Sequence, residues 1–264
     1  MTNVRVYNNG EIDKDQTAAL RERQVPDEEE LKATLAAADY LPNDYFRLRA
    51  KAILSIARLY GKRRSEIATI FLNETEIKND KLYITFEIRK KHKLGLYQYI
   101  KMLNKNNDPV LSTLTYEQLR ENWLEWQHTE AGYKVKTVKR KKTTPLTDIY
   151  AQHIANYLTF MKKTHPKSVY LFPSGRCVFG TDNYTFDYRK PINGQTVRLI
   201  LKPLNQKLWP HLLRKLKGTK TAEKYGRTLE SVFHVKETLD LARTETAMNY
   251  IQGLPREEVS TEVS

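Results

Sequence analysis

Apolar residues recur along much of the chain at the three- and four-residue spacing that places them on one face of a helix. Residues 43–61 follow this spacing at Ile53, Ile56, Ala57 and Tyr60. The segment ends at Gly61, a residue type that commonly ends a helix. Residues 146–163 repeat the pattern, with Ile154, Tyr157, Leu158 and Met161 facing inward. Each of these two segments is therefore predicted to be an amphipathic helix.

Further helices are expected before, between and after these two. Residues 25–39 begin with Pro26 and a run of acidic residues, which suit the first turn of a helix. Residues 63–72 are interpreted as a short helix, and 168–174 as a short buried strand or turn. The second half of the chain is expected to be helical over 193–208, 210–218, 228–241 and 244–253.

Two segments alternate in the manner of strands. Residues 81–93 and 133–146 are rich in β-branched and aromatic residues, and we expect them to form a β-hairpin. The hairpin carries a helical insertion at 94–132. Its apolar stripe, Tyr116, Leu119, Trp123 and Trp126, is typical of packing rather than of a platform for stacked bases.

Together these elements predict a mainly α fold with a small antiparallel β-sheet, an α+β class. One folded domain is expected over 24–252, with the helical insertion at 94–132. Residues 1–23 are polar and irregular, and we interpret them as a flexible N-terminal arm. Residues 253–264 are predicted to be a polar, acidic tail.

The charge is strongly positive, at +14, and it is unevenly spread. Lysine and arginine greatly outnumber acidic residues over 89–142 and again over 202–227. Clustering of this kind favours a polyanionic partner, above all nucleic acid. The alternative is a basic protein with a solvated lysine surface.

Several other classes of protein are disfavoured. The single cysteine, Cys177, excludes an internal disulfide and indicates a reducing compartment. No apolar run has the length of a membrane span, and the N-terminus lacks the apolar segment of a signal peptide. No zinc-ligand spacing or P-loop is present. We expect a cytoplasmic protein that needs no metal or other cofactor.

Three motifs carry candidate chemistry. Arg63 follows Gly61 in "GKRRSEI", and Tyr250 lies in "RTETAMNYI". His211 and Arg214 are three residues apart in "HLLR", so both side chains lie on the same helical face. That face could pack against a neighbouring element, or it could hold a phosphate.

The order of these motifs resembles the catalytic domain of the tyrosine recombinases, the phage-integrase family. Arg63 matches the first catalytic arginine of that family, "HLLR" its His-x-x-Arg box, and Tyr250 its nucleophile. The segments at 25–39 and "KKTTPLTD" resemble its first helix and the junction after its β-hairpin. The resemblance covers 24–252. The chain also resembles, more loosely, the integrases of archaeal mobile elements. Each motif alone is common by chance, but all three in order are specific.

The resemblance implies a site-specific recombinase or integrase that cleaves and rejoins DNA without ATP or metal. Arg63 and Arg214 would bind the phosphate oxygens and offset charge in the transition state, for which the planar guanidinium is well suited. Tyr250 would attack phosphorus and form a 3′-phosphotyrosine. His211 would help to deprotonate the tyrosine or position the phosphate.

The resemblance also implies a lysine on the hairpin that protonates the departing 5′-oxygen. Lys90 is favoured by its distance from Arg63, with Lys91 next, and Lys136 and Lys139 remain open. The expected DNA-contacting residues are Lys91, Lys93, Lys136, Lys139, Arg140, Lys215 and Lys217. The expected partner is double-stranded DNA, bound by a tetramer on paired sites, with a monomer in isolation.

The sequence departs from the family pattern near the nucleophile. Leu241 stands where a phosphate-binding His or Trp is usual, and Asp240 stands where Gly is common. Arg243 is near enough to supply the missing donor. Only 1–24 precede the first helix, where the family usually has a second DNA-clamping domain, and the 94–132 insertion could compensate by adding a helix near DNA. Two alternatives therefore stay open: a catalytically weakened or inactive DNA-binding relative, and an RNA-binding basic protein, for which the usual glycine-aromatic signature is absent.

Overall fold

The computed structural model describes residues 26–106, 114–177, 184–208, 210–226, 228–241 and 243–251. The predicted arm at 1–23 and tail at 253–264 lie outside these residues. The chain divides into two compact units. The first consists of residues up to Phe86 together with those from Lys141 onward, and the second is Glu87–Arg140. Each unit is described by itself.

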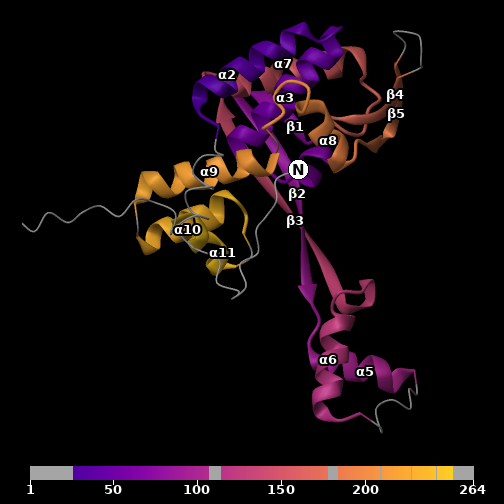
Figure 1. The fold of residues 1–264 in the computed structure, drawn as a ribbon. Helices are drawn as coiled ribbons and strands as arrows, with labels where there is room; N and C mark the ends of the chain where they lie inside the picture. Colours follow the sequence, from indigo (N-terminus) through magenta and orange to yellow (C-terminus); the bar gives the residue numbers. More distant parts are fainter. Residues whose placement is uncertain are drawn as a thin grey trace, which may run out of the picture. The chain divides into compact units, whose positions relative to one another are not determined.

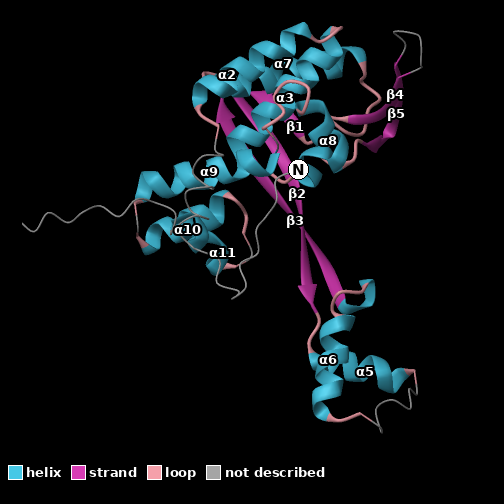
Figure 2. Ribbon diagram, viewed as in Figure 1, coloured by secondary structure: helices cyan, strands magenta, loops and turns pink. Residues whose placement is uncertain are grey.

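The first unit is mainly helical, as predicted (Figures 1 and 2). Its helices are α2 (Glu28–Ala37), η1 (Ala38–Tyr40), α3 (Asp44–Tyr60), α4 (Arg64–Ala68), α7 (Ile149–Thr164), α8 (Gly194–Leu201), α9 (Pro210–Tyr225), α10 (Leu229–Thr238) and α11 (Thr244–Ile251). Its strands β1 (Thr75–Lys78) and β2 (Lys81–Lys93) pair antiparallel, and β3 (Tyr133–Pro145) completes a sheet of order β1-β2-β3. The predicted fold class is confirmed.

Local sequence signals set the ends of the first helices. The carboxylate of Asp27 accepts a hydrogen bond from the backbone N–H of Glu30, and Asn43 caps α3 in the same way through Phe46. Helix α3 ends at Gly61, whose φ of 56° lies in the left-handed region that favours glycine. The backbone therefore turns directly from α3 into the motif that carries Arg63.

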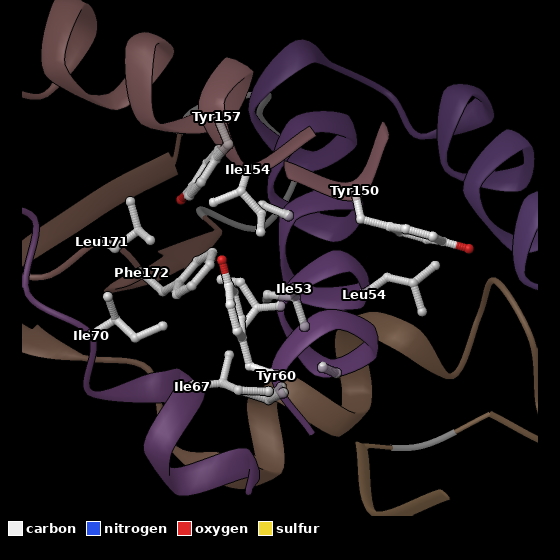
Figure 3. Packing of buried hydrophobic residues seen from close by; sticks show 14 of the residues in the cluster. Ile53, Leu54, Tyr60, Ile67, Ile70, Tyr150, Ile154, Tyr157, Leu171 and Phe172 are labelled. Atoms are coloured by element: carbon white, nitrogen blue, oxygen red, sulfur yellow. The ribbon is translucent and has the colours of Figure 1, made fainter. Parts of the chain in front are cut away.

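The main hydrophobic core lies between α3 and α7, together with residues of α2, β2, α4 and α8 (Figure 3). Ile53 and Leu54 of α3 are fully buried, as are Ile154 and Tyr157 of α7. Tyr157 stacks on Phe172, with 5.2 Å between ring centroids. The inward-facing positions predicted for both helices are confirmed, because the helical spacing directs them to one shared face.

A second, smaller hydrophobic cluster is formed by the end of α9 with α10 and α11. We call it the C-terminal cluster; its buried members are Ala222, Val232, Val235, Leu239, Leu241, Ala247 and Ile251. Helix α9 takes part in both cores, because Leu213 and Leu216 belong to the main core and Ala222 to the C-terminal cluster. The "HLLR" motif thus lies on the helix that joins the two cores.

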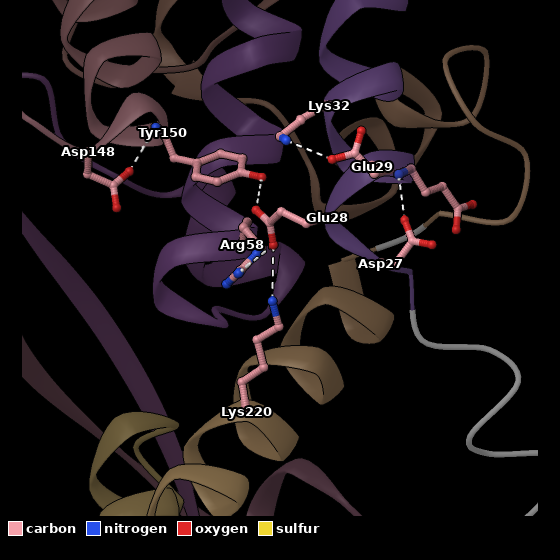
Figure 4. Close-up of polar contacts among 9 residues, drawn as sticks. Asp27, Glu28, Glu29, Lys32, Arg58, Asp148, Tyr150 and Lys220 are labelled. Atoms are coloured by element: carbon pink, nitrogen blue, oxygen red, sulfur yellow. Dashed lines mark hydrogen bonds and ion pairs between the residues drawn. The ribbon is translucent and has the colours of Figure 1, made fainter.

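A polar cluster around Glu28 links α9 to α2, α3 and α7 (Figure 4). Glu28 of α2 accepts hydrogen bonds from Arg58 of α3 at 2.9 Å, Tyr150 of α7 at 2.5 Å and Lys220 of α9 at 3.0 Å. Burial by itself raises the pKa of Glu28, but these three donors outweigh it and hold the pKa at about 2. One carboxylate therefore connects four helices.

Some elements were not predicted. Strand β1 is one, and a two-stranded antiparallel sheet of β4 (Pro173–Cys177) and β5 (Tyr184–Pro191) is another. Helix α9 also continues well past Gly218, where the predicted segment ended. The predicted short element at 168–174 forms a bridge between Tyr170 and Phe71, followed by the buried Leu171 and Phe172.

The second unit contains the inner parts of β2 and β3 with α5 (Leu96–Lys105), α6 (Tyr116–Trp126) and η3 (Glu130–Gly132). Helix α5 was not predicted, whereas α6 was. Trp126 packs on Tyr99 of α5, and Trp123 donates a hydrogen bond to the Leu94 carbonyl at 3.0 Å. The expected packing role is therefore correct for both tryptophans, but it is wrong for Tyr116, which is 65% exposed.

Candidate functional site

Arg63 lies immediately after the turn that ends α3, and Glu66 fixes its orientation. The Glu66 carboxylate accepts hydrogen bonds from the backbone N–H of Arg63 at 3.0 Å and from its guanidinium at 2.8 Å. The side chain of Glu66 is almost fully buried, while that of Arg63 is 48% exposed. A buried carboxylate thus holds an accessible guanidinium in one place, which pre-organises it for an anion.

Arg214, on α9, is buried beneath the same surface. Its guanidinium donates hydrogen bonds to the Gly61 carbonyl at 2.6 Å and the Leu239 carbonyl at 2.5 Å. Only 3% of the residue is exposed. These bonds involve two of the five N–H donors of a guanidinium. Arg214 therefore places a fixed positive charge where α9 passes the C-terminal ends of α3 and α10.

Tyr250, on α11, packs closely against α9. A Cβ atom at Gly218 would lie 2.5 Å from Cδ1 and from Cε1 of Tyr250, so the ring occupies the space that a larger residue would fill. The tyrosine is half-buried at the edge of the C-terminal cluster. Because Gly218 lies one helical turn beyond Arg214, this contact sets Tyr250 beside the arginine's helix.

Charged and polar groups from three separate segments converge on Arg214. Burial lowers the pKa of Arg214 most, and the positive charge of Arg63 lowers it further. Three acidic groups act in the opposite direction: Glu66, Tyr250 and Asp240. Since a guanidinium keeps its proton throughout the accessible pH range, Arg214 remains a cation here. The structure therefore brings together three of the predicted residues, Arg63, Arg214 and Tyr250.

His211 lies in the first turn of α9 and is exposed. It shares a helix with Arg214 at the predicted spacing. Two predicted DNA contacts on the same helix, Lys215 and Lys217, are half-buried rather than exposed. Burial lowers the pKa of Lys217, whose methylenes lie against Gly61. Part of this basic helix therefore packs its lysine stems onto the fold.

The hairpin residues lie in the second unit, so the structure does not set them against Tyr250. Lys90, Lys91 and Lys93 are in β2, and the side chains of the first two are outside the described part. In β3, Lys136, Lys139 and Arg140 are exposed, and Lys139 lies 3.9 Å from Glu87. Lys90 as the catalytic lysine stays a prediction.

The unusual residues near Tyr250 have clear structural places. Leu241 is 6% exposed and belongs to the C-terminal cluster, so it serves as a core residue. Arg243, two residues later, is exposed. His234 stacks on Tyr225, with 3.9 Å between ring centroids, and contacts Glu230 at 3.2 Å.

Two features of this site were not predicted from the sequence: the contact of Glu66 with Arg63, and the ion pair of Lys62 with Asp240. Glu66 was visible in the "GKRRSEI" motif through its three-residue spacing from Arg63, which places both on one helical face. Lys62 and Asp240 form a buried ion pair below the arginines. Its two members are far apart in sequence, and only the unusual Asp240 gave any signal.

The described residues hold no helix that is both long and apolar enough to cross a membrane. Within the same residues, no group of three or more His, Cys, Asp or Glu is arranged as metal ligands would be.

Comparison with known proteins gives matches among solved structures alone. No protein-family model matches the chain, and neither does any curated protein sequence. The chain is similar to XerH site-specific recombinase bound to its difH substrate in a pre-cleavage complex, with 14% identity, a TM-score of 0.47, and coverage of 86% of this chain and 49% of that one. It is similar to XerA recombinase at 14% identity and a TM-score of 0.49, covering 88% and 59%. A post-cleavage complex of XerH with a palindromic difH substrate matches at 16% identity and a TM-score of 0.45, covering 87% and 49%. The chain thus spans about half the length of these proteins.

Proposed function

We propose that this chain is a DNA strand-transfer enzyme of the tyrosine recombinase type, with Tyr250 as its nucleophile. The observation that carries the proposal is the convergence of Arg63, Arg214 and Tyr250 from three separate segments on one charged site. Two guanidiniums beside a tyrosine suit a phosphodiester, since its non-bridging oxygens are anionic and the phenol oxygen can attack phosphorus.

The chemistry follows from these groups. Arg63, held by Glu66, and the remaining donors of Arg214 bind the non-bridging oxygens and offset the charge that builds up in the transition state. The Tyr250 oxygen forms a bond to phosphorus as the bond from phosphorus to the 5′-oxygen breaks. The product is a 3′-phosphotyrosine and a free 5′-hydroxyl, and reversal on another strand rejoins DNA without ATP.

Two proton transfers complete the step. The Tyr250 proton passes to His211 or to water positioned by it, because His211 lies on the helix that carries Arg214. The departing 5′-oxygen takes a proton from a hairpin lysine, for which Lys90 is the first candidate and Lys91 the second. Lys136 and Lys139 remain alternatives on the returning strand.

The partner in this proposal is double-stranded DNA. A net charge of +14, concentrated in the hairpin strands and α9, supports an electrostatic contact with the phosphate backbone. Strand exchange requires two paired sites and hence four subunits on DNA, with a monomer in isolation.

Leu241 favours a second candidate function, a DNA-binding relative with weakened or no catalysis. Its buried side chain cannot donate a hydrogen bond to a phosphate, and its place in the C-terminal cluster gives it a structural reason to be apolar. The exposed Arg243 is the nearest candidate for a substitute donor. The two functions differ in whether a covalent intermediate forms.

Covalent trapping with Tyr250→Phe separates them. Nicked duplexes with a randomised region are incubated with the protein, denatured, and examined for a protease-sensitive shift in mobility. We expect a shift with the wild-type protein and none with Tyr250→Phe, at equal DNA affinity. A shift that persists in the variant rules out Tyr250 as the nucleophile. Salt-sensitive binding without any wild-type shift supports the non-catalytic relative.

A further inference from the structure

Helix α11, which carries Tyr250, belongs to the C-terminal cluster, whereas Arg63 is attached to the main core. Helices α10 and α11 pack on each other and on α9. Arg63 instead follows α3, the central helix of the main core. Whatever aligns Tyr250 with Arg63 must therefore connect these two cores.

Lys62 and Asp240 make such a connection. Lys62 directly precedes Arg63, and Asp240 lies in the turn between α10 and α11. The two side chains form an ion pair in which Lys62 is fully buried and Asp240 is 7% exposed. The ammonium also lies over the ring of Phe86, 4.7 Å from its centroid. A charge this deeply buried is stable only with its partner in place, so the pair strongly favours one arrangement of the two turns.

Arg214 also joins these two turns, through the residue before Lys62 in one and the residue before Asp240 in the other. It bonds to the carbonyl of Gly61, which precedes Lys62, and to that of Leu239, which precedes Asp240. The two turns also touch directly, because a Cβ atom at Gly61 would lie 2.7 Å from Leu239 Cδ2. The turn at 61–63 and the turn at 239–241 are thus held by two adjacent polar contacts around a close apolar one.

The backbone at Asp240 suits this role. Its φ of 51° lies in the left-handed region, which Asp and Asn tolerate better than most residues. The chain reverses there and proceeds into α11. Asp240 can therefore fix the start of α11 at a lower cost in backbone strain than a bulkier residue would have there.

We infer that Lys62 and Asp240 are positioning residues, which hold the Tyr250 helix in register with Arg63 and Arg214. The inference rests on the proposed function for its consequence in catalysis, but the alignment of α11 can be measured without DNA. Neither residue need touch the phosphate, since both act through the turns that they join.

The test compares Lys62→Met, Asp240→Asn and the double variant. Methionine keeps the length of the lysine stem, and asparagine keeps the tolerance for a left-handed backbone. The matched control is Lys51→Met with Asp39→Asn. It removes another ion pair of the same unit, 2.7 Å between Lys51 and Asp39, which links α3 to η1. Two quantities are measured: amide hydrogen exchange along α11, and the first-order rate of adduct formation at saturating DNA.

Each single variant leaves one buried charge without its partner, so we expect exchange in α11 to accelerate at least tenfold while α3 keeps its protection. The adduct should form at least tenfold more slowly, with DNA affinity within about twofold of wild type. The two residues act as one unit, so the loss in the double variant should be smaller than the sum of the two single losses. The control pair should change neither quantity.

The outcomes separate the inference from the function on which it rests. Unchanged exchange in α11 in both single variants overturns the positioning role, whatever the rate of adduct formation. A double variant whose loss equals the sum of the two single losses also overturns it, since the coupling between Lys62 and Asp240 would then be absent. If the wild-type protein forms no adduct while α11 responds as expected, the proposed function fails and the positioning role stands.

Discussion

Among single residues, Gly218 decides how closely Tyr250 approaches α9. Gly218→Ala adds a methyl group within 2.5 Å of two ring carbons of Tyr250 and 2.9 Å of Leu239 Cδ1. The ring must shift, at a cost of about 1–3 kcal/mol for overpacking, which outweighs the gain of about 1 kcal/mol in helix propensity. We expect adduct formation to slow at least tenfold.

The matched control for this change is Glu223→Ala, at an exposed position of the same helix. It should leave both the rate and the thermal stability nearly unchanged. A Gly218→Ala protein as fast as wild type would show that the close contact between Tyr250 and α9 does not matter for catalysis.

The residues with a motif could be predicted from the sequence, and those without one could not. Arg63, Arg214 and Tyr250 each lie in a short recognisable stretch, and their roles at the site stay a prediction. Lys62 and Asp240 are 178 positions apart, and nothing in either local sequence indicates the other. Their pairing depends on the meeting of two turns, which only the packing of α9 against both cores determines.

At the scale of elements, Glu28 links α9 to α2, α3 and α7 by hydrogen bonds that add to the packing of α9 in the two cores. Its pKa in the folded protein, about 2, is below the ordinary 4.5, so its contribution to stability is present above pH 4.5. That contribution is lost as the pH falls from 4.5 toward 2. The carboxylate is 37% exposed, so solvent screening limits the effect to about 1 kcal/mol or less.

Glu28→Gln tests this linkage. The variant should be less stable than wild type at pH 7, and the difference should shrink as the pH falls below 4.5, measured by denaturant unfolding at a series of pH values. Glu29→Gln, in the same helical turn and paired with the exposed Lys32 at 2.7 Å, serves as the control. A difference between Glu28→Gln and wild type that stays constant from pH 7 to pH 3 contradicts the assignment.

Periodicity identified the long helices because their buried faces repeat over several turns. It also supplied a signal for two elements that were missed. Tyr99 and Leu103, four residues apart, are the buried face of α5. In β5, Phe186 and Tyr188 alternate with polar residues and stack at 5.7 Å. Strand β4, in contrast, has the sequence "PSGRC", which shows no alternation, and its pairing with β5 defines it.

At the scale of the whole molecule, the distribution of charge favours some parts over others as the DNA contact of the proposed function. The insertion between Leu94 and Gly132 carries more acidic than basic residues. Three of them, Glu117, Glu121 and Glu125, are exposed on α6 at a four-residue spacing, which places them along one face. A DNA-binding helix in the insertion is disfavoured by this acidic face, and we assign the electrostatic contact to the strands.

Two variants test this assignment through the salt dependence of DNA affinity. Lys136→Gln, Lys139→Gln and Arg140→Gln together should flatten the slope of log K against log salt by about 0.9 for each phosphate that the protein no longer neutralises. In the second variant, an Asn-Gly turn replaces 95–131, because the Leu94 N–H already bonds to the Gly132 carbonyl at 2.9 Å. This deletion should leave the slope unchanged. A flatter slope in the deletion variant would show that the insertion itself contacts DNA.

The most direct test of the central claim is to identify the residue that carries the DNA. The adduct from nicked duplex is digested with nuclease and trypsin, and the modified peptide is sequenced by mass spectrometry. Cleavage after Arg243 and Arg256 releases 244–256, in which Tyr250 is the only tyrosine. We predict that this peptide carries a nucleotide phosphate on Tyr250. A modification on any other residue, or an adduct that leaves 244–256 unmodified, would contradict the account.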